Sequence, residues 1–487
     1  MREFHVEHFG CRAARADGEA ISGRLCAAGL GQGEPEVADV VVVNTCSVTA
    51  EADRAARAYI RRTHRLNPEA RIVVTGCYAQ RAPQELATMA GVAAVVGNSH
   101  KSLAPEIVLG LVNRAGESRS LNPDAPPDLV SLQSLLAGSA PDAAPIWADD
   151  RFAHSFIEEA QLAPGAQTRP NLKIQEGCGN RCTFCVIPTT RGSSKSLPPA
   201  GVLRQVKGFV AAGGNELVLS GINLGRWGRD LQVYDGGSML TLAELVRQIF
   251  RDTELPRLRL SSIEPMDWDS ELIGLMAEFG GIRLARHAHL PLQSGSDAVL
   301  RRMHRRYRPW HYAEKVEALK RAAGPKLTLG ADVMVGFPGE TDAEFVETLE
   351  LVRAVPFGYL HLFPFSPRPG TLGWALHAER PVAPEAVQER MTALRTLAAE
   401  MTRTHRRYFV GRELEAVTLR TPAAIHEQGR TAALSENFLS IEIDGHVAAN
   451  CLVRVRITGL GADGSLQGAL EATEAGVAFP SPALLIQ

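Results

Sequence analysis

Hydrophobic and polar residues follow three different patterns along the 487-residue chain. Over residues 1–115, short runs of valine and isoleucine, such as 40–43 and 72–74, alternate with helical stretches. Continuous apolar runs of this length are typical of parallel strands that are buried on both faces. The first pattern therefore predicts an N-terminal parallel α/β domain.

A second pattern begins near Asn171, where strand candidates recur with helical stretches between them. The six candidates are residues 172–177, 216–221, 257–262, 287–293, 329–336 and 359–365. Six βα units are too few to close an eight-stranded barrel. Residues 169–400 are therefore predicted to form an open, partial (β/α)6 barrel.

The third pattern is an alternation of period two that follows a long helical stretch and predicts five short strands. These are residues 412–421, 429–436, 439–444, 451–459 and 465–470. A small five-stranded β-barrel of the oligonucleotide-binding kind fits residues 405–475. Residues 116–168, rich in Ala, Pro, Asp and Ser, are predicted to be a linker with one short helix.

The composition narrows the class of protein only slightly. A hydrophobic content of 45% can fill several cores, and a net charge of −2 neither favours nor excludes nucleic acid. No apolar run is long enough to span a bilayer, and the first ten residues do not resemble a signal peptide. We therefore expect a cytoplasmic protein without a membrane partner, in which eight cysteines are metal ligands or free thiols.

Three cysteines lie close together in GCGNRCTFC, at Cys178, Cys182 and Cys185. Three thiolates can ligate three irons of a [4Fe–4S] cluster and leave the fourth iron open to a substrate. The alternatives are a zinc site or three buried structural thiols. No fourth Cys or His lies nearby to complete a zinc site, and Gly177 and Gly179 indicate an exposed loop. The spacing thus favours a catalytic iron–sulfur cluster.

A second group of three cysteines is spread over the first domain. Cys11, Cys46 and Cys77 each come just after a predicted strand. Because the carboxyl ends of parallel strands form one edge of a sheet, we expect the three thiols to converge on a second cluster. The alternative, an ordinary small buried residue, is the interpretation we give to Cys26 and Cys451.

These motifs carry a family resemblance. The central trio, with Phe184 before its last cysteine, resembles the signature of radical S-adenosylmethionine (SAM) enzymes. Together with GC at 10–11, NTCSVT at 44–49 and TGCYAQ at 75–80, it resembles the methylthiotransferases of the MiaB, MtaB and RimO types. The likeness covers nearly the whole chain, and LKIQEGC and LSGINLGRWG are most similar to the MtaB type. Ala14 departs from the family, which often has Asn there, whereas Asp17 is kept.

The resemblance implies two [4Fe–4S] clusters and SAM as cofactors. Cys178, Cys182 and Cys185 would hold the cluster that cleaves SAM, and Cys11, Cys46 and Cys77 the cluster that carries the sulfur. The implied reaction places a methylthio group on C2 of N6-threonylcarbamoyladenosine, next to the anticodon of a tRNA. An electron donor such as flavodoxin or ferredoxin is implied as a partner.

Alternatives to this reaction stay open. The substrate could instead be isopentenyladenosine in tRNA or an aspartate of a ribosomal protein. A protein of another class, an iron–sulfur RNA-binding or electron-transfer protein without catalysis, is also considered. The C-terminal barrel corresponds to the family's TRAM domain, which is implicated in tRNA binding, or else it is a structural cap over the core.

Further residues are candidates for contacts with SAM. Besides Phe184 they are Gly213, Gly214, Ser262, Glu264, Gln293 and Asp332. The glycine pair could let the backbone approach a ligand, although a tight turn between a helix and a strand explains it equally well. For the polar residues, surface or packing roles are the alternative.

Three basic groups are candidates for phosphate contacts. They are residues 301–308, residues 403–412, and a helix with Arg54, Arg57, Arg61, Arg62 and Arg65. A run of charge is more often a solvated face, so each group alone is weak evidence. Beside a nucleic-acid type of barrel, the three together favour RNA binding.

Overall fold

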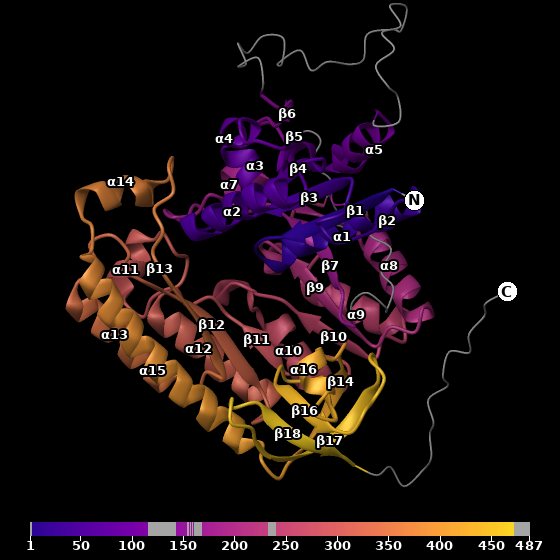
Figure 1. The fold of residues 1–487 in the computed structure, drawn as a ribbon. Coiled ribbons are helices and arrows are strands. Elements are labelled where there is room, and N and C mark those ends of the chain that lie inside the picture. The colour runs from indigo at the N-terminus through magenta and orange to yellow at the C-terminus, as the bar shows by residue number, and fades with distance from the viewer. Residues whose placement is uncertain are drawn as a thin grey trace, which may run out of the picture.

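Three bodies of secondary structure follow one another along the chain, coloured from indigo to yellow in Figure 1. The computed structural model describes residues 2–114, 143–152, 155, 157, 159, 168–231 and 240–471. The first body is stacked on one end of the central one, and the third closes the other end (Figure 1). The predicted fold class is confirmed in each body.

The N-terminal body is a fully parallel sheet in the order β2-β1-β3-β4-β5-β6. Its strands are β1 Glu3–His8, β2 Gly31–Gln32, β3 Val40–Thr45, β4 Arg71–Gly76, β5 Val92–Gly97 and β6 Ile146–Trp147. Its helices are α1 Arg12–Ala27, α2 Ala50–Leu66, α3 Cys77–Arg81, α4 Pro83–Ala87, η1 Asn98–Leu103 and α5 Ala104–Arg114.

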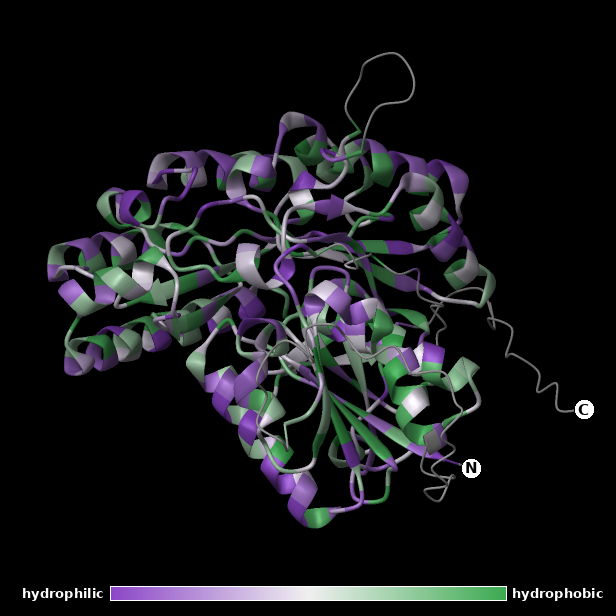
Figure 2. Cartoon of the chain, turned by 90° about the horizontal axis from the view of Figure 1, so that it is seen from above, coloured by the Kyte–Doolittle hydropathy of each residue, from purple (hydrophilic) through white to green (hydrophobic). Residues whose placement is uncertain are grey.

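The valine run of β3 is buried on both faces of this sheet. Val41 and Val43 pack in a core that includes Ile60 of α2, whereas Val42 packs in a separate core that includes Ile21 of α1. Each face of the strand therefore has an apolar partner, as the continuous run predicts. In Figure 2 the strands are largely coloured as hydrophobic, and hydrophilic residues gather on the outer helices.

The sheet extends into the segment that we predicted as a linker. Val95 and Val96 of β5 pair with Ile146 and Trp147 of β6. The interpretation of residues 116–168 as linker throughout was therefore wrong, because two apolar residues are too short a run to show periodicity. The predicted short helix lies outside the described residues.

The central body is an open curved sheet with helices on its outer side. Its βα strands are β7 Asn171–Glu176, β9 Glu216–Gly221, β10 Arg257–Leu260, β11 His287–His289, β12 Thr328–Val335 and β13 Tyr359–Pro364. Strands β7, β9 and β10 pair in parallel, as do β11, β12 and β13, and an isolated bridge joins Leu258 to Leu284 between the two groups. Strand β8, Lys195–Ser196, pairs antiparallel with β7.

Outer helices cover the apolar face of each central strand. They include α8 Pro199–Ala211, α9 Leu242–Asp252, α10 Ser270–Phe279, α12 Pro309–Ala323 and α13 Asp342–Ala354. Leu217 and Leu219 of β9 and Leu329 of β12 belong to the large core on this side. Because side chains alternate along a strand, the polar residues between these positions face the interior of the barrel. The inward row includes Lys173, Glu216, Arg259, His289, Asp332 and His361.

Shorter helices and the long α15 complete the chain. They are α7 Ile187–Arg191, η2 Leu224–Arg226, η3 Pro265–Asp267, α11 Asp297–Arg302, α14 Leu372–Glu379, α15 Pro384–Tyr408 and α16 Ala423–His426. Helix α15 leads into a closed barrel in the order β14-β15-β16-β18-β17. Its strands are β14 Glu413–Thr418, β15 Arg430–Ser435, β16 Ser440–Asp444, β17 Leu452–Leu460 and β18 Leu466–Leu470.

The C-terminal barrel is fixed to the amino ends of the central strands by polar contacts. Glu436, which is buried, accepts hydrogen bonds of 3.0 Å from the backbone N–H and from Nε of Arg286. Arg259 donates to the carbonyl oxygen of Ser435 at 3.1 Å. The ring of Phe438 packs 4.4 Å from that of His287. The barrel is therefore a cap on the core, whatever else it binds.

No helix in the described part of the chain is both long enough and apolar enough to cross a membrane.

Replacing Glu436 with Gln should weaken this cap, because the Arg286 guanidinium loses its charged partner. We expect the free energy of unfolding to fall by about 2 kcal/mol. Glu413→Gln is the control, since Glu413 forms its ion pair with Arg456 at a half-exposed position and should cost less than about 0.5 kcal/mol. Denaturation in urea, followed by circular dichroism, measures both; equal losses would contradict the assigned role of Glu436.

Candidate metal centres

The three N-terminal cysteines lie at the carboxyl edge of the first sheet, as predicted. Cys11 is the residue before α1, Cys46 follows β3, and Cys77 is the first residue of α3 directly after β4. Gly10 has a φ of +110°, and a Cβ built on it would lie 2.6 Å from Cβ of Cys46. Glycine is needed there because any side chain would push the Cys11 loop away from Cys46.

Cys46 and Cys77 are buried, whereas Cys11 is exposed. Burial raises the pKa of Cys46 to about 12, and its neighbours Cys77 and Cys11 act in the same direction. A metal ion that binds buried thiols displaces their protons and supplies the positive charge that stabilises the resulting thiolates. Asn98 Nδ2 and Arg191 Nε lie 3.4 and 3.3 Å from Sγ of Cys77, so the sulfur has two N–H donors.

The loop after β7 brings Cys178, Cys182 and Cys185 together. Gly177, at a φ of +69°, allows the chain to turn, because a Cβ there would lie 2.0 Å from the carbonyl oxygen of Ser193. The Cys178 N–H donates to the carbonyl of Gly192 at 3.1 Å, and the Cys185 N–H donates to that of Cys182 at 3.2 Å. The loop is therefore folded back on itself around the three sulfurs.

Each of these sulfurs also accepts an N–H. Asn180 N lies 3.4 Å from Sγ of Cys178, and Ile187 N lies 3.5 Å from Sγ of Cys185. Nη1 of Arg305 lies 3.3 Å from Sγ of Cys182. Donors of this kind stabilise thiolate ligands and tune the iron–sulfur clusters that they hold.

A cavity of about 790 Å³ opens next to this loop and is bounded by both bodies. Cys178, Cys182 and Cys185 all line this cavity. Gln80 and Arg81 line it from the N-terminal body, and residues 369–372 line it from the segment after β13.

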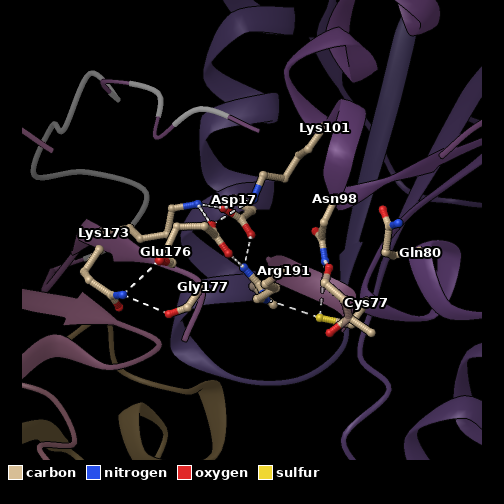
Figure 3. Close-up of polar contacts among 12 residues, drawn as sticks. Asp17, Cys77, Gln80, Asn98, Lys101, Lys173, Glu176, Gly177 and Arg191 are labelled. Atoms are coloured by element: carbon tan, nitrogen blue, oxygen red, sulfur yellow. Dashed lines mark hydrogen bonds and ion pairs between the residues drawn. The ribbon is translucent and has the colours of Figure 1, made fainter. Parts of the chain in front are cut away.

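Five buried charged side chains lie together at the junction of the N-terminal and central bodies, next to Cys77 (Figure 3). They are Asp17 of α1, Lys101 of η1, Lys173 and Glu176 of β7, and Arg191 of α7. Lys101 Nζ lies 3.0 Å from Asp17 and 3.1 Å from Glu176, and Arg191 Nη1 lies 3.1 and 2.5 Å from the same carboxylates. Lys173 also pairs with both. We call this set the charge cluster.

The charge cluster holds three cations and two carboxylates, so one positive charge is in excess. Burial alone would raise the pKa of Glu176, but Arg191, Lys101 and Lys173 hold it well below its usual range. One of the three cations also contacts sulfur, because Arg191 donates a hydrogen bond to Cys77. A metal-bound thiolate at Cys77 would balance this charge.

A second buried contact links the N-terminal body to the segment after β13. Asp53 of α2 accepts from Ser47 and from Arg81, both at 2.8 Å. Arg368, from the central body, pairs with Asp53 and donates to Ser47 Oγ at 2.9 Å. Because Ser47 follows Cys46, this contact fixes the Cys46 loop from the other side.

Not every predicted SAM contact lies near the cysteines. Gly213 and Gly214 precede β9, at the end of the strand opposite the cysteine loop. There, Asn450 of the C-terminal barrel donates to the carbonyl of Gly213 at 2.8 Å. The structure therefore does not bring this pair to the site, and the tight-turn interpretation describes it.

The other predicted contacts lie on the cysteine side or in the barrel interior. Glu264 pairs with Arg305 at 2.5 Å, and the ring of Phe184 packs against Phe337 at 6.5 Å. Ser262 follows β10. Gln293 has a φ of +64° and is buried, and its Oε1 has no hydrogen-bond partner in the described structure.

Asp332 lies between two histidines on the inner face of the barrel. Its Oδ1 is 3.2 Å from Nε2 of His289 and 3.1 Å from Nδ1 of His361. Burial would raise the pKa of Asp332, but the two hydrogen bonds outweigh it and hold the pKa well below the ordinary value. The hydroxyl of Tyr359 lies 3.0 Å from Nδ1 of His289, which extends the polar group.

Three more buried polar atoms near the carboxyl ends of the inner strands lack partners in the described structure. They are Ser220 Oγ, Ser261 Oγ and Asn223 Oδ1. Buried polar groups are almost always hydrogen-bonded, so these three atoms are available to a ligand or to water. Asn223 also donates to Cys178 Sγ at 3.5 Å, which places one of these atoms beside the cysteine loop.

Sequence reasoning missed the residues that donate to sulfur or hold the charge cluster. Asn98, Lys101 and Arg191 lie in no motif that indicates a site, and Lys173 and Asn223 lie in family-like stretches from which no role was assigned to them. Lys173, between the apolar Leu172 and Ile174 of β7, could have indicated the charge cluster. A lysine buried in such a strand needs a carboxylate partner.

The basic run at 301–308 is mostly engaged within the protein. Arg302 pairs with Glu344 at 2.7 Å, Arg306 with Asp267 at 3.4 Å, and Arg308 with Asp297 at 3.1 Å. Arg305 is buried against Cys182. This run therefore serves the core more than a surface. Of the two remaining cysteines, Cys26 is exposed and Cys451 is partly buried, so the expectation of burial was wrong for Cys26.

Comparisons with known proteins agree with this arrangement. Residues 3–97 match the family described as "Uncharacterized protein family UPF0004", and residues 172–352 match the radical SAM superfamily. The structure resembles the radical SAM methyltransferase TsrM from Kitasatospora setae, with a TM-score of 0.50 and 14% identity over 74% of this chain and 73% of that one. The likeness to TsrM concerns the fold alone.

Two relatives match the chain almost throughout. The threonylcarbamoyladenosine tRNA methylthiotransferase MtaB of Bacillus subtilis is 33% identical over 91% of this chain and 90% of its own length. The tRNA-2-methylthio-N(6)-dimethylallyladenosine synthase of Erythrobacter litoralis is 34% identical over 97% of this chain and 98% of its own.

A partial barrel with three cysteines after its first strand defines a radical SAM enzyme. Within that class, the identity to both relatives over more than nine-tenths of the chain is decisive. The chain belongs to the methylthiotransferases of the MiaB/MtaB type. Its cofactors are SAM and two [4Fe–4S] clusters.

Replacing Asp17 with Asn should destabilise the junction of the two bodies, since three buried cations would then face Glu176 alone. We expect a loss of about 3 kcal/mol in the free energy of unfolding. Glu19→Gln on the same helix is the matched control, because Glu19 pairs with the exposed Arg15 and should cost about 0.5 kcal/mol or less. Urea denaturation compares the two variants, and a loss for Asp17→Asn no larger than the control would contradict the role of the charge cluster.

Proposed function

We propose that the protein is a tRNA methylthiotransferase that places a methylthio group on C2 of N6-threonylcarbamoyladenosine next to the anticodon. One observation supports this most strongly: each body places three cysteines after its strands, and a buried charge cluster that also contacts Cys77 holds the two bodies together. A reaction in which two clusters act on one base requires that the two clusters keep a fixed position relative to each other. The name of the Bacillus subtilis relative gives the substrate.

In this proposal each cysteine group holds one [4Fe–4S] cluster through three thiolates. Cys178, Cys182 and Cys185 bind the cluster that also binds SAM, and Cys11, Cys46 and Cys77 bind the second. When bound, the clusters and SAM supply the radical chemistry and the methylthio group. Flavodoxin or ferredoxin is the kind of protein that would supply the electron.

The protein's own residues hold the ligands and orient them. Arg305 donates to Cys182 and is itself held by Glu264, and Arg191 donates to Cys77. N–H donors to a ligating sulfur withdraw negative charge and raise the reduction potential of the site. The unpaired atoms of Ser220, Ser261 and Gln293 are available to the polar groups of SAM.

Dimethylallyladenosine in tRNA is the second candidate substrate. The relative from Erythrobacter litoralis with that name is as similar to this chain as the MtaB protein is. Sequence identity therefore does not separate the two substrates. They differ in chemistry, because the threonylcarbamoyl group ends in a carboxylate and the dimethylallyl group is apolar.

Nucleoside mass spectrometry of tRNA from cells with and without the gene tests the proposed substrate. We expect selective loss of the methylthio form of threonylcarbamoyladenosine when the gene is deleted. Loss of the methylthio dimethylallyl form would transfer the assignment to the second candidate. Unchanged tRNA would contradict the proposal in both forms.

Cysteine variants should separate the roles of the two groups. Cys182→Ala should abolish reductive SAM cleavage and leave the iron of the second group, whereas Cys77→Ala should keep SAM cleavage and lose methylthio transfer. Iron analysis after anaerobic reconstitution and assay of 5′-deoxyadenosine measure these outcomes. Cys26→Ala, on the exposed face of α1, is the control and should change neither. Retained SAM cleavage in Cys182→Ala would contradict the assigned roles.

The exposed face of α2 offers free cations for RNA. Arg61, Arg62 and Arg65 are exposed and form no ion pair with any residue that the structure describes, whereas Arg54 pairs with Glu51 and Arg57 with Glu85. Unpaired arginines can neutralise phosphates and release counterions.

Replacing Arg61 and Arg65 together by Gln should weaken tRNA binding without changing SAM cleavage. The slope of log K against log salt should become shallower by about 2, one unit for each lost phosphate contact. Arg204→Gln on α8 is the control, because Arg204 pairs with Glu159. Binding measured over a series of salt concentrations tests this, and an unchanged slope would exclude α2 as a phosphate contact.

A further inference from the structure

Positive charge is concentrated at the amino end of the barrel interior. Glu216, which is fully buried at the start of β9, lies 3.4 Å from Arg169, 3.6 Å from Arg257 and 2.9 Å from Arg259. Arg257 has a second partner in Glu415, at 3.1 Å. Three guanidinium groups thus share two carboxylates, only one of which is buried.

Arg12 adds a fourth guanidinium and has no acidic partner. It is the first residue of α1 and forms no hydrogen bond or ion pair with any residue in the described part of the chain. Its guanidinium carbon lies 5.5 Å from the centre of the Phe438 ring, and that of Arg259 lies 5.3 Å from the same ring. Glu216, the carboxylate that acts on Arg12, is already paired with three arginines.

This arrangement is costly for the protein alone. A partly buried guanidinium without a carboxylate loses hydration that nothing in the protein replaces. An anion bound beside Phe438 would supply the missing charge.

Arg12 lies next to one predicted cluster ligand and near the inner face of β13. It follows Cys11 directly in the chain. Tyr359, a neighbour of Arg12, lies on the inner face of β13, with its ring 5.2 Å from that of His361. The His361 side chain is 62% exposed, so its imidazole is accessible to a ligand.

We propose that Arg12 binds the carboxylate of the threonylcarbamoyl group on the substrate base, with His361 beside it as a hydrogen-bonding neighbour. This inference rests on the proposed function and deepens it, since it predicts that a base with an acidic side chain is preferred to one with an apolar side chain. A carboxylate held by Arg12 would fix the base next to Cys11. An enzyme that works on one base takes it out of the stack, so the carboxylate enters with the base whereas the backbone phosphates stay outside.

The wild-type enzyme gives the first test, with two RNA substrates. One is an anticodon stem-loop with threonylcarbamoyladenosine, and the other is the same RNA with the threonyl carboxylate converted to its methyl ester. Reconstituted enzyme should show a kcat/KM for the acid at least about tenfold above that for the ester, because a charge-assisted hydrogen bond is lost. Equal values for the two RNAs would overturn the proposal.

Variants then assign the preference to Arg12. Arg12→Gln should lower kcat/KM for the acid by at least about tenfold and leave the ester unchanged, and Arg12→Lys should keep most of the preference. Arg15→Gln, one turn along α1 at an exposed position, is the matched control and should behave as wild type. Iron content and SAM cleavage without RNA show that each variant is folded and loaded.

The other outcomes are distinct. An equal loss on acid and ester in Arg12→Gln would mean that Arg12 binds RNA phosphate or supports the fold, and would overturn the proposal. An unchanged preference in Arg12→Gln would overturn it as well. If wild-type enzyme modifies only the dimethylallyl RNA, the proposed substrate fails first, and the inference about Arg12 falls with it.

Discussion

The rest of the structure depends on the buried charge cluster between the N-terminal and central bodies. Asp17 and Lys101 come from one body, and Lys173, Glu176 and Arg191 from the other. None of these charges could be buried without the others, because an isolated buried ion costs several kcal/mol. The two bodies are therefore held in one relative position by electrostatics as well as by packing.

This constraint connects the junction to the chemistry. Glu176 is two residues before Cys178, Asp17 is on the helix that follows Cys11, and Arg191 touches Cys77. A shift of one body would thus disturb both cysteine groups together. The contact of Arg368 with Asp53 and Ser47 fixes the Cys46 loop in the same way from the opposite side. The junction therefore constrains the chain next to both groups of cysteines.

Most of the fold could be predicted because apolar periodicity is a local property. The valine run of β3 and the six inner strands follow from it directly, and so do the positions of the six cysteines after their strands. The charge cluster could not be predicted, because its members are up to 174 residues apart and become neighbours only after folding. Gly213 and Gly214 were misplaced for a related reason: a glycine pair shows a turn but not the end of the strand that faces the site. The basic run at 301–308 was misjudged because the sequence does not show its acidic partners.

The most direct test of the account is a crystal structure of the anaerobically reconstituted protein with SAM, with iron located by anomalous scattering. The account predicts two four-iron clusters, one on Cys178, Cys182 and Cys185 and one on Cys11, Cys46 and Cys77. It also predicts that Arg191 still contacts Cys77. Zinc at the N-terminal cysteines, or iron at only one group, would contradict the claim that each group holds an iron–sulfur cluster.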